Sequence, residues 1–140
     1  MKKILSLILC LTMVLSLAAC SIGGEATEPA GFTPVSDGDS IGSGATTFPL
    51  EIVDAEGNAI TITVSTDKTT VGEALQELGI LEGTEGDYGL YISTVNGIRA
   101  VYEESGTYWA FYINGEYALT GVDQTPIAEG ETYKLMVEKA

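Results

Sequence analysis

Histidine is missing from all 140 residues of this sequence. Without it the chain lacks the commonest general base and the commonest transition-metal ligand, and neither a Ser–His nor a Cys–His nucleophile pair can form. A phosphate-binding glycine loop is also missing, because Gly83, Gly86 and Gly89 are spaced like turn residues and do not lie between a buried strand and a helix. Carboxylates could still perform acid–base chemistry or bind calcium, although the acidic residues of this stretch do not alternate as in a calcium loop. We therefore expect a binding protein, not an enzyme, with no cofactor and no metal.

Basic residues are scarce. The chain has 6 lysines and arginines against 20 aspartates and glutamates, which gives a net charge of −14. Such a surface is repelled by phosphate backbones, so nucleic acid is excluded as a partner. Anionic lipid headgroups repel it for the same reason, and a contact with a membrane would have to come from a separate anchor.

Cysteine occurs only at Cys10 and Cys20, within an N-terminal segment that has the layout of an export signal. Two lysines precede the apolar residues 4–19, a run shorter than the roughly 20 residues that span a bilayer. The run ends in Leu17-Ala18-Ala19-Cys20, which resembles the lipobox of bacterial lipoproteins. The resemblance implies that residues 1–19 are a signal peptide and that the Cys20 thiol carries a lipid with acyl chains such as palmitate. The protein would then be anchored at the extracytoplasmic face of the cell membrane; the alternative is an uncleaved anchor helix.

Residues 20–47 and residues 48–140 differ in composition. The first segment is rich in Gly, Ser, Thr, Pro and acidic residues, which cannot bury enough apolar surface to fold, so it is predicted to be a flexible tether. The second segment is predicted to be one folded domain, since its apolar residues recur with the periods of strands and helices.

The order of these periodic segments predicts the fold class. Strand patterns cover residues 50–53, 60–65, 90–95, 98–102, 108–113 and 133–138. A helix is predicted over residues 71–79, where Thr70 and Glu73 have capping-box spacing and Gly79 ends the apolar stripe. Turns are predicted at residues 54–58, 96–97 and 114–115, and an acidic loop at residues 82–89. A hairpin, a helix and further strands indicate an α+β domain of the β-grasp type, a mixed sheet packed on one short helix.

Aromatic residues gather in one predicted strand. Trp109 and Phe111 alternate with Tyr108 and Tyr112, so both faces of the strand carry rings. One face must pack on the helix, and the other is either covered or an exposed aromatic surface of the kind that binds ligands. If Trp109 and Phe111 are both buried under the helix, they are core residues and the argument for an aromatic binding site fails.

Two family resemblances cover this part of the chain. Residues 88–98, residues 107–111 and the pair Gly121-Val122 look like the C-terminal domain of the cobalamin carriers intrinsic factor and transcobalamin. The stretch from Trp109 to Glu116, with its Asn-Gly turn, is similar to the bacterial domain of unknown function 4430, which is often found on surface lipoproteins. Both resemblances imply a β-grasp domain over residues 48–140.

The resemblance to the carriers also implies a ligand and a set of site residues. In the carriers this domain closes over one face of the corrin ring through largely apolar and backbone contacts, and a helical-barrel domain holds the other face. The positions that match the ligand side are Leu90, Ile92, Ser93, Thr94, Trp109, Phe111 and Ala118. No helical-barrel domain is expected in this chain, so a partner would have to supply the other half of such a site.

Two functions remain open from the sequence. The first is a lipid-anchored module that binds a corrinoid or another small apolar or amphipathic ligand, together with a partner domain. The second is a cell-surface module for protein–protein interaction or adhesion, which uses a sheet edge or its acidic surface and has no small-molecule site.

Overall fold

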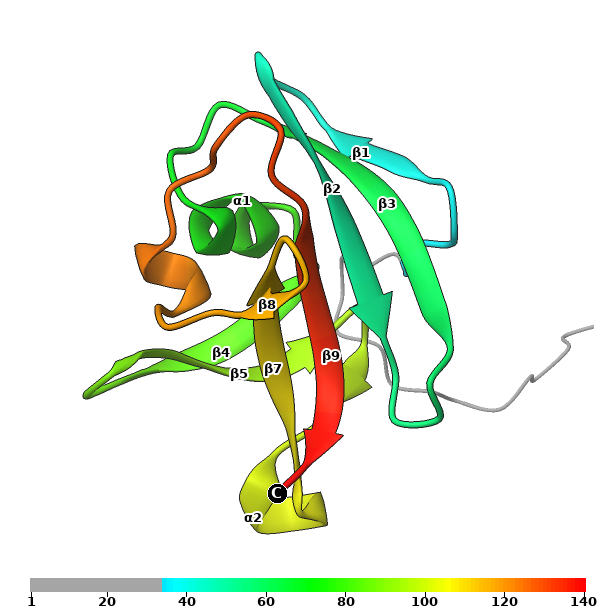
Figure 1. The fold of residues 1–140 in the computed structure, drawn as a ribbon, viewed down its shortest axis with the longest axis vertical. Helices are drawn as coiled ribbons and strands as arrows, with labels where there is room; N and C mark the ends of the chain where they lie inside the picture. The colour runs from blue at the N-terminus through cyan, green and yellow to red at the C-terminus, as the bar shows by residue number, and fades with distance from the viewer. Residues whose placement is uncertain (1–33) are drawn as a thin grey trace, which may run out of the picture.

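The computed structural model describes residues 34–140 (Figure 1). The predicted signal peptide, Cys20 and the first part of the predicted tether lie outside the described residues. No helix within residues 34–140 is long and apolar enough to cross a membrane.

A six-stranded mixed sheet forms the larger layer, in the order β1-β3-β2-β9-β7-β8. Its strands are β1 (Ser40–Gly42), β2 (Thr46–Val53), β3 (Ala59–Thr66), β7 (Thr107–Ile113), β8 (Glu116–Tyr117) and β9 (Tyr133–Lys139). The predicted first hairpin is confirmed, because β2 and β3 pair antiparallel around a turn that Asp54 closes with hydrogen bonds to Glu56 and Asn58. The last strand, β9, runs parallel to β2 and antiparallel to β7, and this makes the sheet mixed.

The short helix α1 (Val71–Glu77) lies against this sheet and begins as predicted. The Thr70 hydroxyl accepts a hydrogen bond from the backbone N–H of Glu73 at 3.2 Å, while the Glu73 carboxylate accepts one from the Thr70 backbone at 3.3 Å. An isolated helix of this length is marginal in water, so tertiary packing must hold it. Its buried residues Val71, Ala74 and Leu75 provide that packing.

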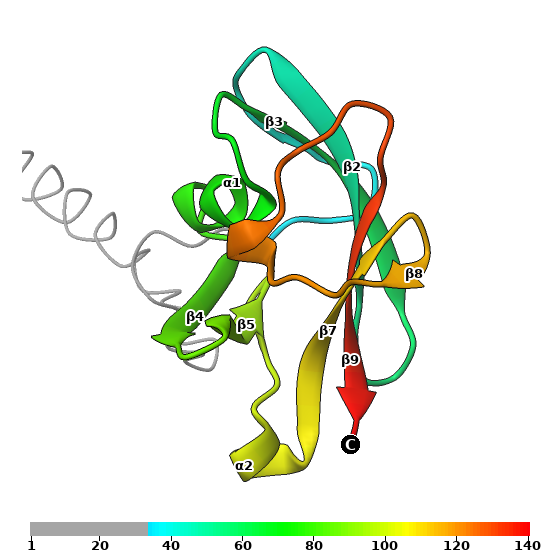
Figure 2. The same cartoon turned by 60° about the vertical axis from the view of Figure 1, so that its left-hand side comes forward.

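A second sheet has three strands, β4 (Leu81–Gly86), β5 (Gly89–Val95) and β6 (Ile98–Arg99). Figures 1 and 2 show α1 and this small sheet on the same side of the large sheet. The 3-10 helix η1 (Val122–Gln124) packs beside α1. Both Asn-Gly turns are confirmed, with φ values of 50° at Asn96 and 51° at Asn114.

Two predicted segments were wrong. The expected acidic loop at residues 82–89 is mostly strand β4, which pairs with β5 along its length. Five of its six residues are at least partly exposed, so β4 is held mainly by backbone hydrogen bonds. Its sequence therefore shows no alternation of apolar and polar residues. The expected strand at residues 98–102 contains only the two residues of β6, and the chain then turns into the short helix α2 (Tyr102–Ser105).

The folded part also begins before Phe48, where the tether was predicted to end. Strand β1 pairs in parallel with β3 within that segment. Upstream of it, Val35 is held at both backbone polar groups by one side chain: its N–H donates to Asn96 Oδ1 at 2.8 Å, and its C=O accepts from Asn96 Nδ2 at 3.0 Å. The composition of this segment does not predict that it is folded, because backbone hydrogen bonds attach it to the domain and few apolar side chains are involved.

The predicted fold class, α+β with a mixed sheet on one short helix, is confirmed. One core lies between the large sheet, α1 and the small sheet, with Phe48, Leu50, Val64, Leu75 and Leu135 almost completely buried.

Candidate functional site

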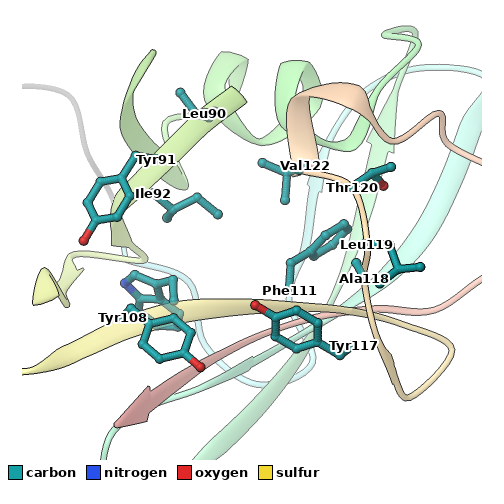
Figure 3. Close-up of a pocket in the computed structure, with 12 residues that line it drawn as sticks. Leu90, Tyr91, Ile92, Tyr108, Phe111, Tyr117, Ala118, Leu119, Thr120 and Val122 are labelled. Carbon is teal, nitrogen blue, oxygen red and sulfur yellow. The ribbon is translucent and has the colours of Figure 1, made fainter. Parts of the chain in front are cut away.

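A groove of about 450 Å³ opens between β5, β7 and the segment that joins β8 to η1 (Figure 3). Its volume falls within the range of about 300–1,000 Å³ that is usual for small-ligand sites. The lining residues are Leu90, Tyr91, Ile92, Tyr108, Trp109, Phe111, Tyr117, Ala118, Leu119, Thr120, Gly121 and Val122.

The floor of the groove is apolar and almost fully buried. Trp109 and Phe111 are each 7% exposed and belong to the main core, and Leu90 and Ile92 reach the floor from β5. Phe111 stacks on Tyr133 with ring centroids 6.1 Å apart. Of the two alternatives left open for this face of β7, the structure shows the core one, so the argument from an exposed aromatic surface fails for Trp109 and Phe111. They line the groove nonetheless, because β5 and η1 lie across from them and leave part of the space between open.

Trp109 carries an unpartnered polar atom. Its Nε1–H is buried, and no hydrogen-bond acceptor for it is found within residues 34–140. A buried donor without a partner costs roughly 1–3 kcal/mol. The atom has almost no accessible surface, so an acceptor in the groove would reach it only after the indole shifts.

The rim is exposed and aromatic. Tyr91 is 42% exposed, Tyr117 is 57% exposed and Leu119 is 99% exposed. Leu119 lies on the segment after β8 and beside Ala118 in Figure 3. An apolar side chain this exposed at the edge of a groove has no role in the core, which makes it a candidate ligand contact.

Carboxylates are attached to the lining through hydrogen bonds. Glu103 accepts from the Tyr91 hydroxyl at 3.5 Å and Glu138 accepts from the Tyr108 hydroxyl at 3.1 Å. Asp123, in η1, accepts from the backbone N–H of Leu90 at 3.1 Å. None of the four basic residues of the described part lines the groove. The potential at the rim is therefore negative.

The same carboxylate of Glu138 also binds Tyr112, on the outer face of β7. This hydrogen bond, together with desolvation, raises the pKa of Tyr112 to about 12. The pKa of Tyr108 is raised as well, first by its hydrogen bond to Glu138. Lys134 lies over the Tyr112 ring, 5.3 Å from the centroid, so this face already holds one cation on an aromatic ring.

Five of the seven residues that the resemblance placed near a ligand line the groove: Leu90, Ile92, Trp109, Phe111 and Ala118. Ser93 and Thr94 do not. The Ser93 hydroxyl donates to the backbone C=O of Glu82 at 3.2 Å, and Thr94 pairs with Glu82 and Arg99 inside the small sheet.

Sequence reasoning missed the contribution of the chain between β8 and η1. Tyr117, Leu119, Thr120 and Val122 form one wall of the groove. The available signal was Leu119, a large apolar residue between Ala118 and Thr120 that lies outside the predicted strands and helix. No three acidic or cysteine side chains of the described chain lie close enough together to hold a metal ion.

The fold and the groove together define a small α+β domain of the β-grasp type with an apolar, acid-rimmed groove on the helix side of its sheet. Residues 68–138 match the family model described as "Domain of unknown function (DUF4430)", and the chain belongs to this family.

Two solved structures are similar to this chain. A protein from Ruminococcus gnavus ATCC 29149, described as a "putative metal binding protein", is 25% identical with a TM-score of 0.64, and the match covers 69% of this chain and 99% of that one. Haptocorrin in complex with Cbi is 19% identical with a TM-score of 0.46, and the match covers 67% of this chain. This chain spans 25% of the haptocorrin chain. A search of curated proteins finds no match.

Proposed function

We propose that this protein is a lipid-anchored extracytoplasmic binding module whose groove between β5 and β7 takes a small amphipathic ligand. The observation that carries the proposal is a groove of about 450 Å³ with a buried apolar floor and an exposed rim that includes Tyr91, Tyr117 and Leu119. The floor would bury the apolar part of the ligand, and its polar part would lie at the rim beside the Tyr117 side chain. Such a combination of apolar lining and few polar groups is typical of small-ligand sites.

A corrinoid is the first ligand to test. Its candidacy depends on the resemblance in sequence to the cobalamin carriers, and five residues named from that resemblance line the groove. The groove covers a ligand from one side, so a partner domain that covers the other side would raise the affinity. We propose binding without turnover, since a histidine-free site offers no general base with a pKa near neutrality.

The ligand proposal can be tested by fluorescence, because Trp109 is the only tryptophan in the chain. The full chain in a mild detergent is titrated with cobalamin, and emission is corrected for inner-filter absorption. We expect saturable quenching. Unchanged emission at the highest cobalamin concentration would exclude the corrinoid, and a screen of other amphipathic ligands without any saturable response would refute the small-molecule site.

A matched pair of variants shows whether a response comes from the groove. Tyr117 lines it and is 57% exposed, whereas Tyr102 lies outside it and is 54% exposed. Tyr117→Ser should weaken binding about fivefold to tenfold, because it removes about 1 kcal/mol of apolar contact. Tyr102→Ser should leave the affinity unchanged; an equal loss in both variants would place the ligand elsewhere.

The anchor is tested separately in cells. Labelled palmitate should be incorporated into the wild-type chain and not into Cys20→Ser, and the variant should leave the membrane fraction. Equal labelling of both chains, or an unlabelled wild-type chain in the cytosol, would contradict the proposed anchor and localisation.

A further inference from the structure

The edge of β7 that borders the groove is open. On its other edge β7 pairs with β9 along its whole length, but β8 covers only Tyr112 and Ile113. Among the described residues no strand lies beside residues 107–110 on the β8 side. Beyond the end of β8, the Ala118 N–H also reaches this edge, where it donates to the Phe111 C=O at 2.9 Å.

The direction of the backbone groups on β7 follows from its hydrogen bonds. Toward β9, Ala140 donates to the C=O of Gly106 at 3.3 Å, and Asn114 donates to Thr132 at 2.8 Å, so even-numbered residues face β9. Phe111 faces the opposite edge, as its bond with Ala118 shows. Because backbone groups alternate between the two edges of an antiparallel strand, the N–H and C=O of Trp109 face the open edge. An extended chain beside β7 could pair with both.

The two faces of β7 determine which side chains such an added strand would carry. Side chains of the added strand that lie on the same face as Trp109 and Phe111 enter the apolar groove. Residues on the opposite face lie near Tyr108 and its cross-strand partner Glu138, a carboxylate beside aromatic rings. Lys134 on this same face already lies over the Tyr112 ring. A strand that alternates apolar and basic residues is complementary to both faces.

We propose that the open edge of β7 binds an extended segment of a partner protein in which apolar and basic residues alternate. The partner adds a strand to the large sheet, with its apolar side chains in the groove and its basic side chains beside Tyr108, from where they extend toward the Glu138 carboxylate that binds the Tyr108 hydroxyl. The negative rim made by Glu103, Asp123 and Glu138, with no basic residue in the lining, selects against acidic segments. Strand addition to an open sheet edge is a known mode of peptide recognition. The proposal goes beyond small-ligand binding and does not depend on it.

Three synthetic peptides test this directly with the full chain in detergent. The first alternates lysine and valine, the second alternates glutamate and valine, and the third is the lysine peptide with N-methyl groups on the amides of one edge. We expect saturable binding of the first and no binding of the second. The third should bind at least about tenfold more weakly, because N-methylation removes the strand hydrogen bonds and keeps the charge. Equal binding of the lysine peptide and its N-methylated form, or no binding of either, would overturn the proposal.

Amide hydrogen exchange by NMR identifies the edge that is used. The lysine peptide should protect the backbone N–H of Trp109, which faces the open edge, and should leave that of Ala110, which faces β9, unchanged. Unchanged exchange at Trp109 with the peptide bound would also overturn the proposal. A small ligand alone would shift the Nε1–H resonance of Trp109 without protecting its backbone, so the failure of either proposal can be recognised separately.

A variant of the protein provides the reverse test. Thr107 also faces the open edge, so Thr107→Pro blocks strand addition there without removing a hydrogen bond to β9. It should abolish binding of the lysine peptide and leave the circular dichroism spectrum unchanged. Full binding by a folded Thr107→Pro chain would contradict the edge assignment; if the variant does not fold, the N-methylated peptide decides.

Discussion

Replacing Trp109 by phenylalanine separates the stability of the fold from the binding function of the groove. Trp109→Phe removes one polar N–H and a few buried carbon atoms at a position that is 7% exposed. The lost apolar contact costs about 1 kcal/mol, the order of one or two buried CH₂ groups. The Nε1–H has no partner within residues 34–140, and removing a buried, unpaired donor returns roughly 1–3 kcal/mol. We therefore expect the free energy of unfolding to change by less than about 1 kcal/mol, or to rise.

The matched control is Phe111→Leu on the same strand. Phe111 is also 7% exposed and lines the same groove, but it has no polar atom whose removal could compensate. This variant should lose about 1–2 kcal/mol. Urea unfolding followed by circular dichroism measures both variants without relying on tryptophan emission.

Ligand affinity should change in the opposite sense to stability. By calorimetry, Trp109→Phe should bind a groove ligand about fivefold more weakly, because the groove floor loses about 1 kcal/mol of apolar contact with the ligand. A Trp109→Phe variant destabilised by more than about 3 kcal/mol would refute the reasoning, because it would mean that the indole N–H contributes to folding.

Three further outcomes follow from the contacts. Glu138 raises the pKa of Tyr112 from 10.0 to about 12, chiefly by a hydrogen bond. The folded state therefore binds the Tyr112 proton more tightly than the unfolded state does. The stability that this gives is complete below pH 10 and is lost as the pH rises to about 12. Unfolding measured across this range should show a smaller loss of stability in Glu138→Gln. Asn96→Ala should lower the free energy of unfolding in urea by about 2–3 kcal/mol, because it removes both hydrogen bonds to Val35 and leaves a non-glycine residue at φ 50°. Asn96→Gly should recover only the cost of the positive φ, not that of the lost hydrogen bonds. An Asn96→Ala variant as stable as the wild type would show that Asn96 does not hold Val35 in place. Gly72→Ala should lower the melting temperature, because the alanine Cβ would lie 2.8 Å from the Asp123 backbone. This clash outweighs the higher helix propensity of alanine, which is worth about 1 kcal/mol. A higher melting temperature would show that η1 can move away from the added Cβ at little cost.

The elements with strong local signals were predictable, and the reason is visible in their contacts. The capping box at Thr70 and Glu73 and the turns at Asn96 and Asn114 depend on neighbours in sequence, and all of them are confirmed. Strand β4 was not predictable, because its partner β5 supplies backbone hydrogen bonds and its mostly exposed side chains carry no period. The same holds for β1, which joins the sheet through parallel pairing with β3 and has only one half-buried side chain.

The groove shows the same division. Alternation indicated that Trp109 and Phe111 share a face, and the resemblance to the cobalamin carriers implied that Leu90 and Ile92 belong to the same site. These four residues do line the groove. The sequence could not predict that Leu119 lies at the rim of the groove, because its position depends on the path of the chain between β8 and η1 past the groove.

By itself, the sequence determined the fold class, the acidic and histidine-free chemistry and the alternation of rings along one strand, because each of these follows from composition or from short-range spacing. Only the tertiary structure decided that the rings are buried yet line a groove and that, among residues 34–140, the Trp109 Nε1–H has no acceptor and one edge of β7 has no strand beside it. These properties depend on what lies across from a side chain or beside a strand, and the residues concerned are distant in sequence.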